Sequence, residues 1–93
     1  MFDFDITNEL KLKIRKLCKK DKRKSEIINK KIKEIIKNTP ETIVRYKNLR
    51  YDLKNHKRVH IDKHFVLTFK VNNKENFILF IDFDHHDRVY KRK

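Results

Sequence analysis

Two stretches decide the fold of this chain: RVHIDKHFVLTFKV, from Arg58 to Val71, and FILFIDFDHHDRVY, from Phe77 to Tyr90. Both are rich in β-branched and aromatic residues, and their apolar side chains recur at every second position over most of their length. A period of two predicts β-strands that bury one face. The polar segment between the stretches is short, so we expect the two strands to pair as an antiparallel hairpin.

The alternation also predicts which side chains face the core. The first strand offers one apolar face, made of Val59, Ile61, Phe65, Leu67, Phe69 and Val71. The second strand offers Phe77, Leu79, Ile81 and Phe83. Burying both sets on one side fixes the register, because a slip of one residue would turn a whole set to solvent. The expected pairs are Val71 with Phe77, Leu67 with Ile81, and Phe65 with Phe83.

The same register brings polar residues together on the other face of the hairpin. Extended further, it sets His64 opposite Asp84 and Asp62 opposite His86. His60 belongs to the same face as His64, because every second residue of a strand shares a face. We therefore expect His60, His64 and His86 to cluster there.

The N-terminal half predicts a strand followed by two helices. Residues 2–6 alternate like a short strand, and Thr7 suits the N-cap of a helix that runs to a polar break at residues 21–25. Isoleucines at helical spacing then predict a second helix, which ends near Asn38, before Pro40. Two helices joined so closely form an antiparallel hairpin, and the apolar face of the sheet gives their apolar stripes a surface to cover.

These elements predict an α+β fold in a single domain that spans residues 1–93. Its order is an N-terminal strand, an antiparallel helical hairpin and a C-terminal antiparallel sheet, or β-α-α-β-β. The basic segment 46–58 reads as a loop with room for one further short strand.

The composition is strongly basic. The 26 lysines and arginines stand against 13 acidic residues and give a formal charge of +13 over 93 residues. Such an excess points to a polyanionic partner such as nucleic acid, the ribosome or an acidic protein segment; the plain alternative is a soluble basic protein.

The single cysteine, Cys18, excludes an internal disulfide and a cysteine-based zinc site, and we expect it to be half-buried. The apolar runs are too short and too interrupted by charges to span a membrane, so we expect a cytoplasmic protein.

The element order, together with the motifs HIDKHFVLTFKV at residues 60–71 and HHDRVY at residues 85–90, resembles the RelE/ParE toxin superfamily and is most similar to its RelE and YafQ-like branch. This resemblance implies a small basic toxin of a type II toxin–antitoxin system that cleaves mRNA on the ribosome. It further implies an acidic antitoxin, the ribosome and mRNA as partners, with no cofactor and no metal.

The resemblance also suggests roles for individual residues. His60 and His86 match histidines of the YafQ-like branch, His86 at the position of its C-terminal catalytic histidine. His64 stands where that branch has an acidic residue, and Lys47 where it has another histidine. The arginine that RelE itself carries in this strand is replaced by Val66, so another cation has to stabilise the phosphate. The candidates for binding RNA are Lys47, Arg50, Arg58, Arg88, Tyr90 and Lys91.

The chemistry of RNA cleavage suits these residue types. The 2′-hydroxyl is the nucleophile, so the site has to supply a base, an acid for the leaving 5′-oxygen, and positive charge near the phosphate. Histidine can do both proton transfers because its ordinary pKa is about 6.5. We predict His86 as general acid or base, with His60 and His64 as the other half, and expect His56 and His85 to be solvated.

Three alternatives remain open from the sequence. The histidines and aspartates could form a metal site, although four residues along a strand separate two ligands by about 13 Å. The protein could instead be a non-catalytic module that binds RNA or the ribosome. It could also be a ParE-like toxin directed at gyrase.

Overall fold

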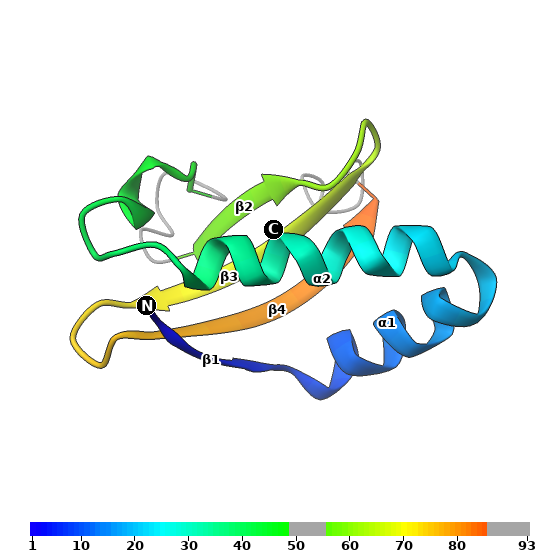
Figure 1. Ribbon diagram of the computed structural model, residues 1–93, viewed down its shortest axis with the longest axis horizontal. Coiled ribbons are helices and arrows are strands. Elements are labelled where there is room, and N and C mark those ends of the chain that lie inside the picture. The colour runs from blue at the N-terminus through cyan, green and yellow to red at the C-terminus, as the bar shows by residue number, and fades with distance from the viewer. Residues whose placement is uncertain (49–55, 86–93) are drawn as a thin grey trace.

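The computed structural model describes residues 1–48 and 56–85, and it confirms the α+β architecture (Figure 1). The elements are β1 (Asp3–Ile6), α1 (Asn8–Lys20), α2 (Lys22–Ile36), a 3₁₀-helix η1 (Ile43–Arg45), β2 (His56–His60), β3 (Phe65–Asn72) and β4 (Phe77–His85). The four strands form one sheet in the order β1-β4-β3-β2. β1 is parallel to β4, and the other neighbours are antiparallel. None of the described helices is long and apolar enough to cross a membrane.

The helical hairpin forms as expected, but its break is shorter than the sequence suggested. Thr7 caps α1, since its hydroxyl oxygen accepts a hydrogen bond from the Leu10 N–H at 3.2 Å. Asp21 alone separates the helices, and its carboxylate caps α2 by accepting from the Lys24 N–H at 3.0 Å. The predicted break at 21–25 was therefore wrong beyond Asp21, because one aspartate is enough to end one helix and begin the next. Cys18 is exposed, not half-buried.

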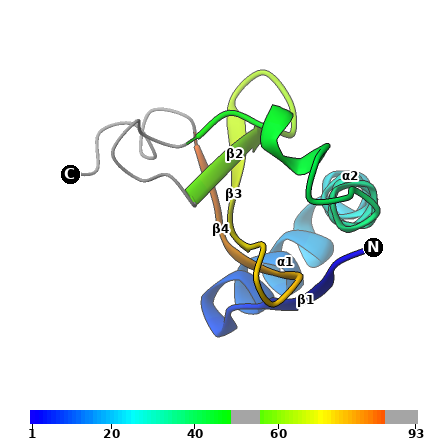
Figure 2. The same cartoon turned by 90° about the vertical axis from the view of Figure 1, so that its left-hand side faces the viewer.

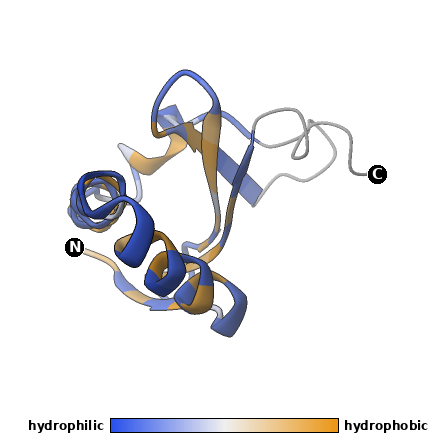
Figure 3. Ribbon diagram, turned by 90° about the vertical axis from the view of Figure 1, so that its right-hand side faces the viewer, coloured by the Kyte–Doolittle hydropathy of each residue, from blue (hydrophilic) through white to orange (hydrophobic). Residues whose placement is uncertain are grey.

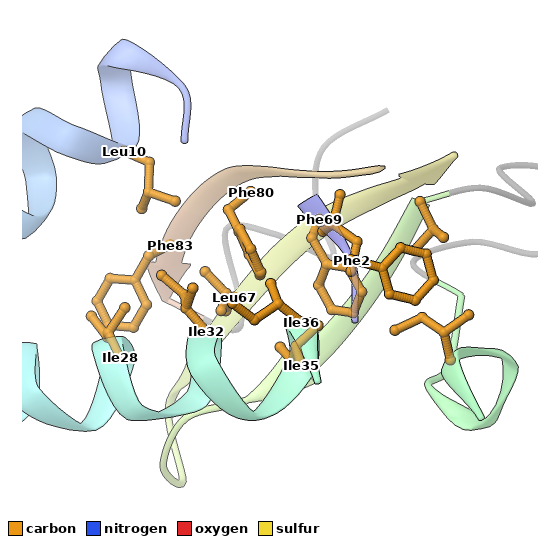
Figure 4. Packing of buried hydrophobic residues seen from close by; sticks show 13 residues of the cluster. Phe2, Leu10, Ile28, Ile32, Ile35, Ile36, Leu67, Phe69, Phe80 and Phe83 are labelled. Carbon is orange, nitrogen blue, oxygen red and sulfur yellow. The ribbon is translucent and has the colours of Figure 1, made fainter. Parts of the chain in front are cut away.

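The core lies between the helices and one face of the sheet, with α2 crossing that face (Figure 2). Hydrophilic and hydrophobic segments alternate along the turns of α1 (Figure 3), as a helix packed on one side requires. The four buried isoleucines of α2 point at the aromatic residues of β3 and β4 (Figure 4). The buried cluster includes Leu10, Ile28, Ile32, Ile35, Ile36, Leu67, Phe69, Ile78, Phe80 and Phe83. Each large side chain buried there stabilises the fold by about 1.5–3 kcal/mol.

The predicted register between β3 and β4 was wrong. The structure pairs Val71 with Ile78 and Phe69 with Phe80, then Leu67 with Phe83 after a β-bulge. The extra residue of the bulge is Ile81, which stands between the partners of Thr68 and Phe69. The residues of β4 that face the core are therefore Ile78, Phe80 and Phe83. β4 lies between two strands and is apolar at every position from 77 to 81, so alternation could not select its core face.

The long strand expected from Arg58 to Val71 is in fact two antiparallel strands. β2 ends at His60 and β3 begins at Phe65, and residues 61–64 turn between them. Asp62 holds this turn, because its carboxylate accepts hydrogen bonds from the N–H groups of His64 at 2.9 Å and Phe65 at 3.1 Å. The predicted pairing of His64 with Asp84 was wrong, since the partner of Asp84 is Val66. Asp62 lies in the turn, and its predicted partner His86 lies outside the described residues.

Candidate functional site

Polar and charged side chains gather on the face of the sheet turned away from α2, which we call the outer face. Leu67 and Phe69 of β3 belong to the core, so their neighbours Val66 and Thr68 point the other way. Residues directly paired across an antiparallel sheet share a face. The register therefore gives the outer face Arg58 and His60 from β2, Val66 and Thr68 from β3, and Asp82 and Asp84 from β4.

These residues form two rows that run across the strands, here called the outer-face rows. One row is Arg58, Thr68 and Asp82; the other is His60, Val66 and Asp84. Each row has a basic or proton-carrying residue on β2 and a carboxylate on β4. Adjacent strands are about 4.8 Å apart, so the ends of a row are separated by about 10 Å at the backbone.

The carboxylates on β4 are held by a lysine from α1. The Lys13 Nζ lies 2.7 Å from Asp82 Oδ1 and 3.6 Å from Asp84 Oδ2, and it also donates to the Phe83 carbonyl at 3.2 Å. The side chain of Asp82 is only 8% exposed, so this ammonium supplies the charge that a buried carboxylate requires. Sequence reasoning missed Lys13, because 69 positions separate it from Asp82 and no local pattern marks the pair.

The predicted cluster of histidines is divided by the sheet. His60 is exposed at the end of β2 and belongs to the outer face. His64 lies in the turn, where its ring stacks on His85 with centroids 5.9 Å apart and planes 8° apart. His85 pairs with Phe65 on β3, and the two rings meet edge to face at 5.5 Å. His60 and His64 therefore do not share one face of a single strand, because β2 ends at His60. His85 was expected to be solvated, but it is half-buried.

Lys47 lies beside the edge of β2 that faces away from β3, and Lys57 lies on β2 itself, where it forms an antiparallel bridge with Asn48. The Lys47 carbonyl accepts the Arg58 N–H at 3.0 Å, which sets exposed Lys47 beside the Arg58 backbone. Lys57 is buried, and its ammonium donates to the Tyr46 carbonyl at 3.1 Å and to Asn48 Oδ1 at 2.9 Å. Burial lowers the pKa of Lys57, because neither acceptor carries a full charge.

The remaining predicted site residues are Arg50, His86, Arg88, Tyr90 and Lys91, and they lie outside the described residues. Within residues 1–48 and 56–85, no group of three or more histidines, cysteines and acids could hold a metal ion. The described part of the site thus contains a histidine that can carry a proton, an arginine that can bind a phosphate, and two carboxylates anchored by a lysine.

No family model matches the sequence, but single relatives do. The chain is 46% identical over 93 residues to the Methanocaldococcus jannaschii protein named "Putative toxin RelE4", and the alignment covers all of this chain and 95% of that protein. A Methanosarcina mazei protein without a functional name is 44% identical over 90 residues, which are 97% of this chain and the whole of that protein.

Solved toxin structures share the fold. YafQ from Escherichia coli superposes with a TM-score of 0.70 at 16% identity, covering 97% of this chain and 99% of that one. A metal-bound toxin from Helicobacter pylori superposes with a TM-score of 0.72 at 16% identity, and the match covers 95% of this chain and 98% of that one. A YoeB/ParE toxin from Agrobacterium tumefaciens superposes with a TM-score of 0.71 at 15% identity, and the match covers 91% of this chain and 99% of that one.

The sheet and the helical hairpin thus give this chain the fold of these small toxins. The identity to the archaeal relative along the whole chain makes the assignment specific: this chain belongs to the RelE-like toxin family.

Proposed function

We propose that this protein is a type II toxin that cleaves mRNA on the ribosome by metal-independent attack of the RNA 2′-hydroxyl. One observation carries the proposal: Arg58 and His60 lie on the same face of one ordered strand, two residues apart, at the start of the outer-face rows. Residues two apart on a strand are separated by about 6.6 Å. This separation suits a phosphate held by Arg58 beside a 2′-hydroxyl or 5′-oxygen near His60.

Each side chain has a role that follows from its chemistry. Arg58 binds the scissile phosphate through its planar guanidinium and stabilises the charge that develops there. His60 transfers one proton, and His86 transfers the other from the C-terminal segment. Lys47, beside the Arg58 backbone, belongs with Arg50, Arg88 and Lys91 as cations that track the RNA, and Tyr90 stacks on a base.

The role expected for His64 stays a prediction. Its exposed ring is stacked on His85 and does not share the face of His60, so it would act from the far side of the β2–β3 turn. The partners under this proposal are the ribosome, mRNA and an acidic antitoxin, and the protein works in the cytoplasm.

The test is a cleavage assay with purified ribosomes, a defined mRNA and the variants His86→Gln and His60→Gln. General acid–base catalysis contributes about 10²–10⁴-fold, so each variant should lose about that much cleavage while it still binds ribosomes. His56→Gln is the matched control, since His56 lies on the same strand and face as His60 but about 13 Å away, where it pairs with Lys70. It should retain most of the activity.

Two further readouts separate the mechanism from its alternatives. The products should end in 2′,3′-cyclic phosphates, and EDTA should not change the rate. Inhibition by a chelator that a divalent ion reverses would favour a metal site. Folded His86→Gln and His60→Gln proteins with full activity would remove both histidines from the mechanism.

A further inference from the structure

Lys57 is a charged side chain on the core side of β2. Its partner across the sheet is Phe69, which belongs to the core, and Lys57 itself is 7% exposed. Its ammonium forms no ion pair with any acid among residues 1–48 and 56–85. A methionine would fill a similar space without the cost of burying a charge. What this lysine contributes therefore lies in the groups that its ammonium holds.

The Lys57 ammonium ties a neighbouring segment to β2. It donates to the Tyr46 carbonyl at 3.1 Å and to Asn48 Oδ1 at 2.9 Å. These two acceptors flank Lys47, whose own carbonyl accepts the Arg58 N–H at 3.0 Å. Three consecutive residues are thus attached to the strand. We call Lys57 together with residues 46–48 the β2 clamp.

The register of the β2 clamp decides where the Lys47 side chain lies. Asn48 is the antiparallel partner of Lys57, so the two side chains share the core side of β2. Lys47 precedes Asn48 and therefore belongs to the opposite side, where it is exposed. The same register sets Lys47 opposite Arg58. The outer-face row that contains Arg58 is thus extended by a second cation.

Two cations placed in this way suit a single phosphate. The Cβ atoms of directly opposite residues are about 4.5–5.5 Å apart, and like charges at that separation destabilise the pairing of the strands. A phosphate between Lys47 and Arg58 would accept charge-assisted hydrogen bonds from both and remove their repulsion. Without RNA this repulsion acts to push Lys47 away from β2, so the segment requires a fixed attachment.

We propose that Lys57 is a positioning residue for RNA cleavage: from the core side of β2, its ammonium holds Lys47 opposite Arg58, so that both cations bind the scissile phosphate. The inference rests on the proposed function and adds to it a residue that does not touch RNA. Positive charge that is held in place before RNA binds needs no rearrangement during the reaction. A displacement of about 1 Å in such a group can lower the rate by about 10²-fold.

The test is a double-mutant cycle in single-turnover cleavage of a defined mRNA on ribosomes. It compares the unaltered protein, Lys57→Met, Lys47→Ala and the variant with both changes. Lys30→Met is the control, because it removes one positive charge from an exposed position of α2. Hydrogen exchange at the Arg58 N–H, followed by NMR without RNA, reports on the β2 clamp directly. Far-UV circular dichroism checks that the variants fold.

We expect Lys57→Met to lower the cleavage rate at least about tenfold, and Lys30→Met to change it little. In the Lys47→Ala background, Lys57→Met should cost less than about twofold, because a residue that acts through Lys47 then has nothing to position. The Arg58 N–H should exchange faster in Lys57→Met than in Lys30→Met, since its acceptor is no longer held.

An equal loss of cleavage with and without Lys47, or unchanged exchange at Arg58, would overturn the inference. If Lys57→Met does not fold, Asn48→Ala removes an acceptor of the same ammonium and Asn48→Asp keeps one. Asn48→Asp should then retain more cleavage than Asn48→Ala, and equal activities would overturn the inference too. An unaltered protein that cleaves no mRNA would refute the proposed function instead, and exchange at Arg58 would still decide whether Lys57 holds the β2 clamp.

Discussion

At the scale of single residues, Asp62 shows how one carboxylate decides a turn. It accepts two backbone hydrogen bonds, from His64 and Phe65, and lies 3.6 Å from the Lys24 Nζ. Burial alone would raise the pKa of Asp62, but these N–H groups and the Lys24 ammonium together hold it below its ordinary value. The turn that ends β2 and begins β3 is therefore stabilised by the ionised form of Asp62.

Substitution of Asp62 tests this account through the pH dependence of stability. Asp62→Ala should lower the free energy of unfolding by about 1 kcal/mol at pH 7, because it leaves two N–H groups without their acceptor on a partly exposed turn. The pKa of Asp62 is lower in the folded than in the unfolded protein, so its stabilisation is complete above about pH 4 and is lost as the pH falls through the folded pKa.

Urea unfolding at a series of pH values between 7 and 3 measures this difference. Asp62→Ala and the unaltered protein should converge in stability towards the acid end of the series. Asp62→Asn is the control, since its amide oxygen can still accept the turn hydrogen bonds, and it should lose less. An Asp62→Ala protein as stable as the unaltered one at pH 7 would contradict the account.

Residue-scale features differ in how far the sequence could predict them. Thr7 was recognisable as a cap, because its signal is local and the hydrogen bond joins it to Leu10. The Lys13–Asp82 pair was not, since it depends on how α1 packs beside β4. The assignment of His60 and His64 to one face failed because the alternation was extended across residues 61–64, although Lys63 occupies a position of the apolar face and the backbone turns there.

At the scale of elements, the β-bulge of β4 explains why the strands were found but their register was not. β1 ends at Ile6, opposite Phe80, and α1 leaves the sheet there. The Thr7 N–H donates to the Phe80 carbonyl at 3.0 Å, and its hydroxyl donates to the Ile81 carbonyl at 2.6 Å. The extra residue therefore lies where β4 loses β1 as its neighbour, and that position depends on a segment more than 70 residues away in sequence.

The register makes a prediction that separates the observed pairing from regular alternation. Ile78 is fully buried, whereas Leu79 is half-buried on the outer face. Ile78→Ala should cost about 2–5 kcal/mol of stability, and Leu79→Ala about 1 kcal/mol, because only the first leaves a cavity in the core. Thermal or urea unfolding of the two variants gives the comparison. A larger loss for Leu79→Ala would restore the register expected from the sequence.

At the scale of the whole molecule, the main feature is the large positive net charge. Exposed lysines and arginines lie on both helices, while several acids are already paired: Asp5 with Lys11, Asp82 and Asp84 with Lys13, and Asp62 with Lys24. The net charge of +13 is therefore presented to partners instead of being neutralised within the fold. The sequence predicted this property directly, because charge is a sum over residues and does not depend on register.

Binding to single-stranded RNA should accordingly depend steeply on salt. A protein that neutralises Z phosphates of a single strand loses affinity with a slope of about −0.7Z in log–log form, so about five contacts predict roughly a hundredfold loss between 50 and 200 mM salt. Because the charge is spread over both helices, Lys16→Glu/Lys20→Glu and Lys30→Glu/Lys33→Glu should weaken RNA binding to a similar extent and each reduce the slope. Titration of a labelled RNA octamer at several salt concentrations measures both. A slope near zero would exclude phosphate contacts as the source of RNA affinity, and a loss confined to one variant would show that RNA binds a local site and not the molecule's general field.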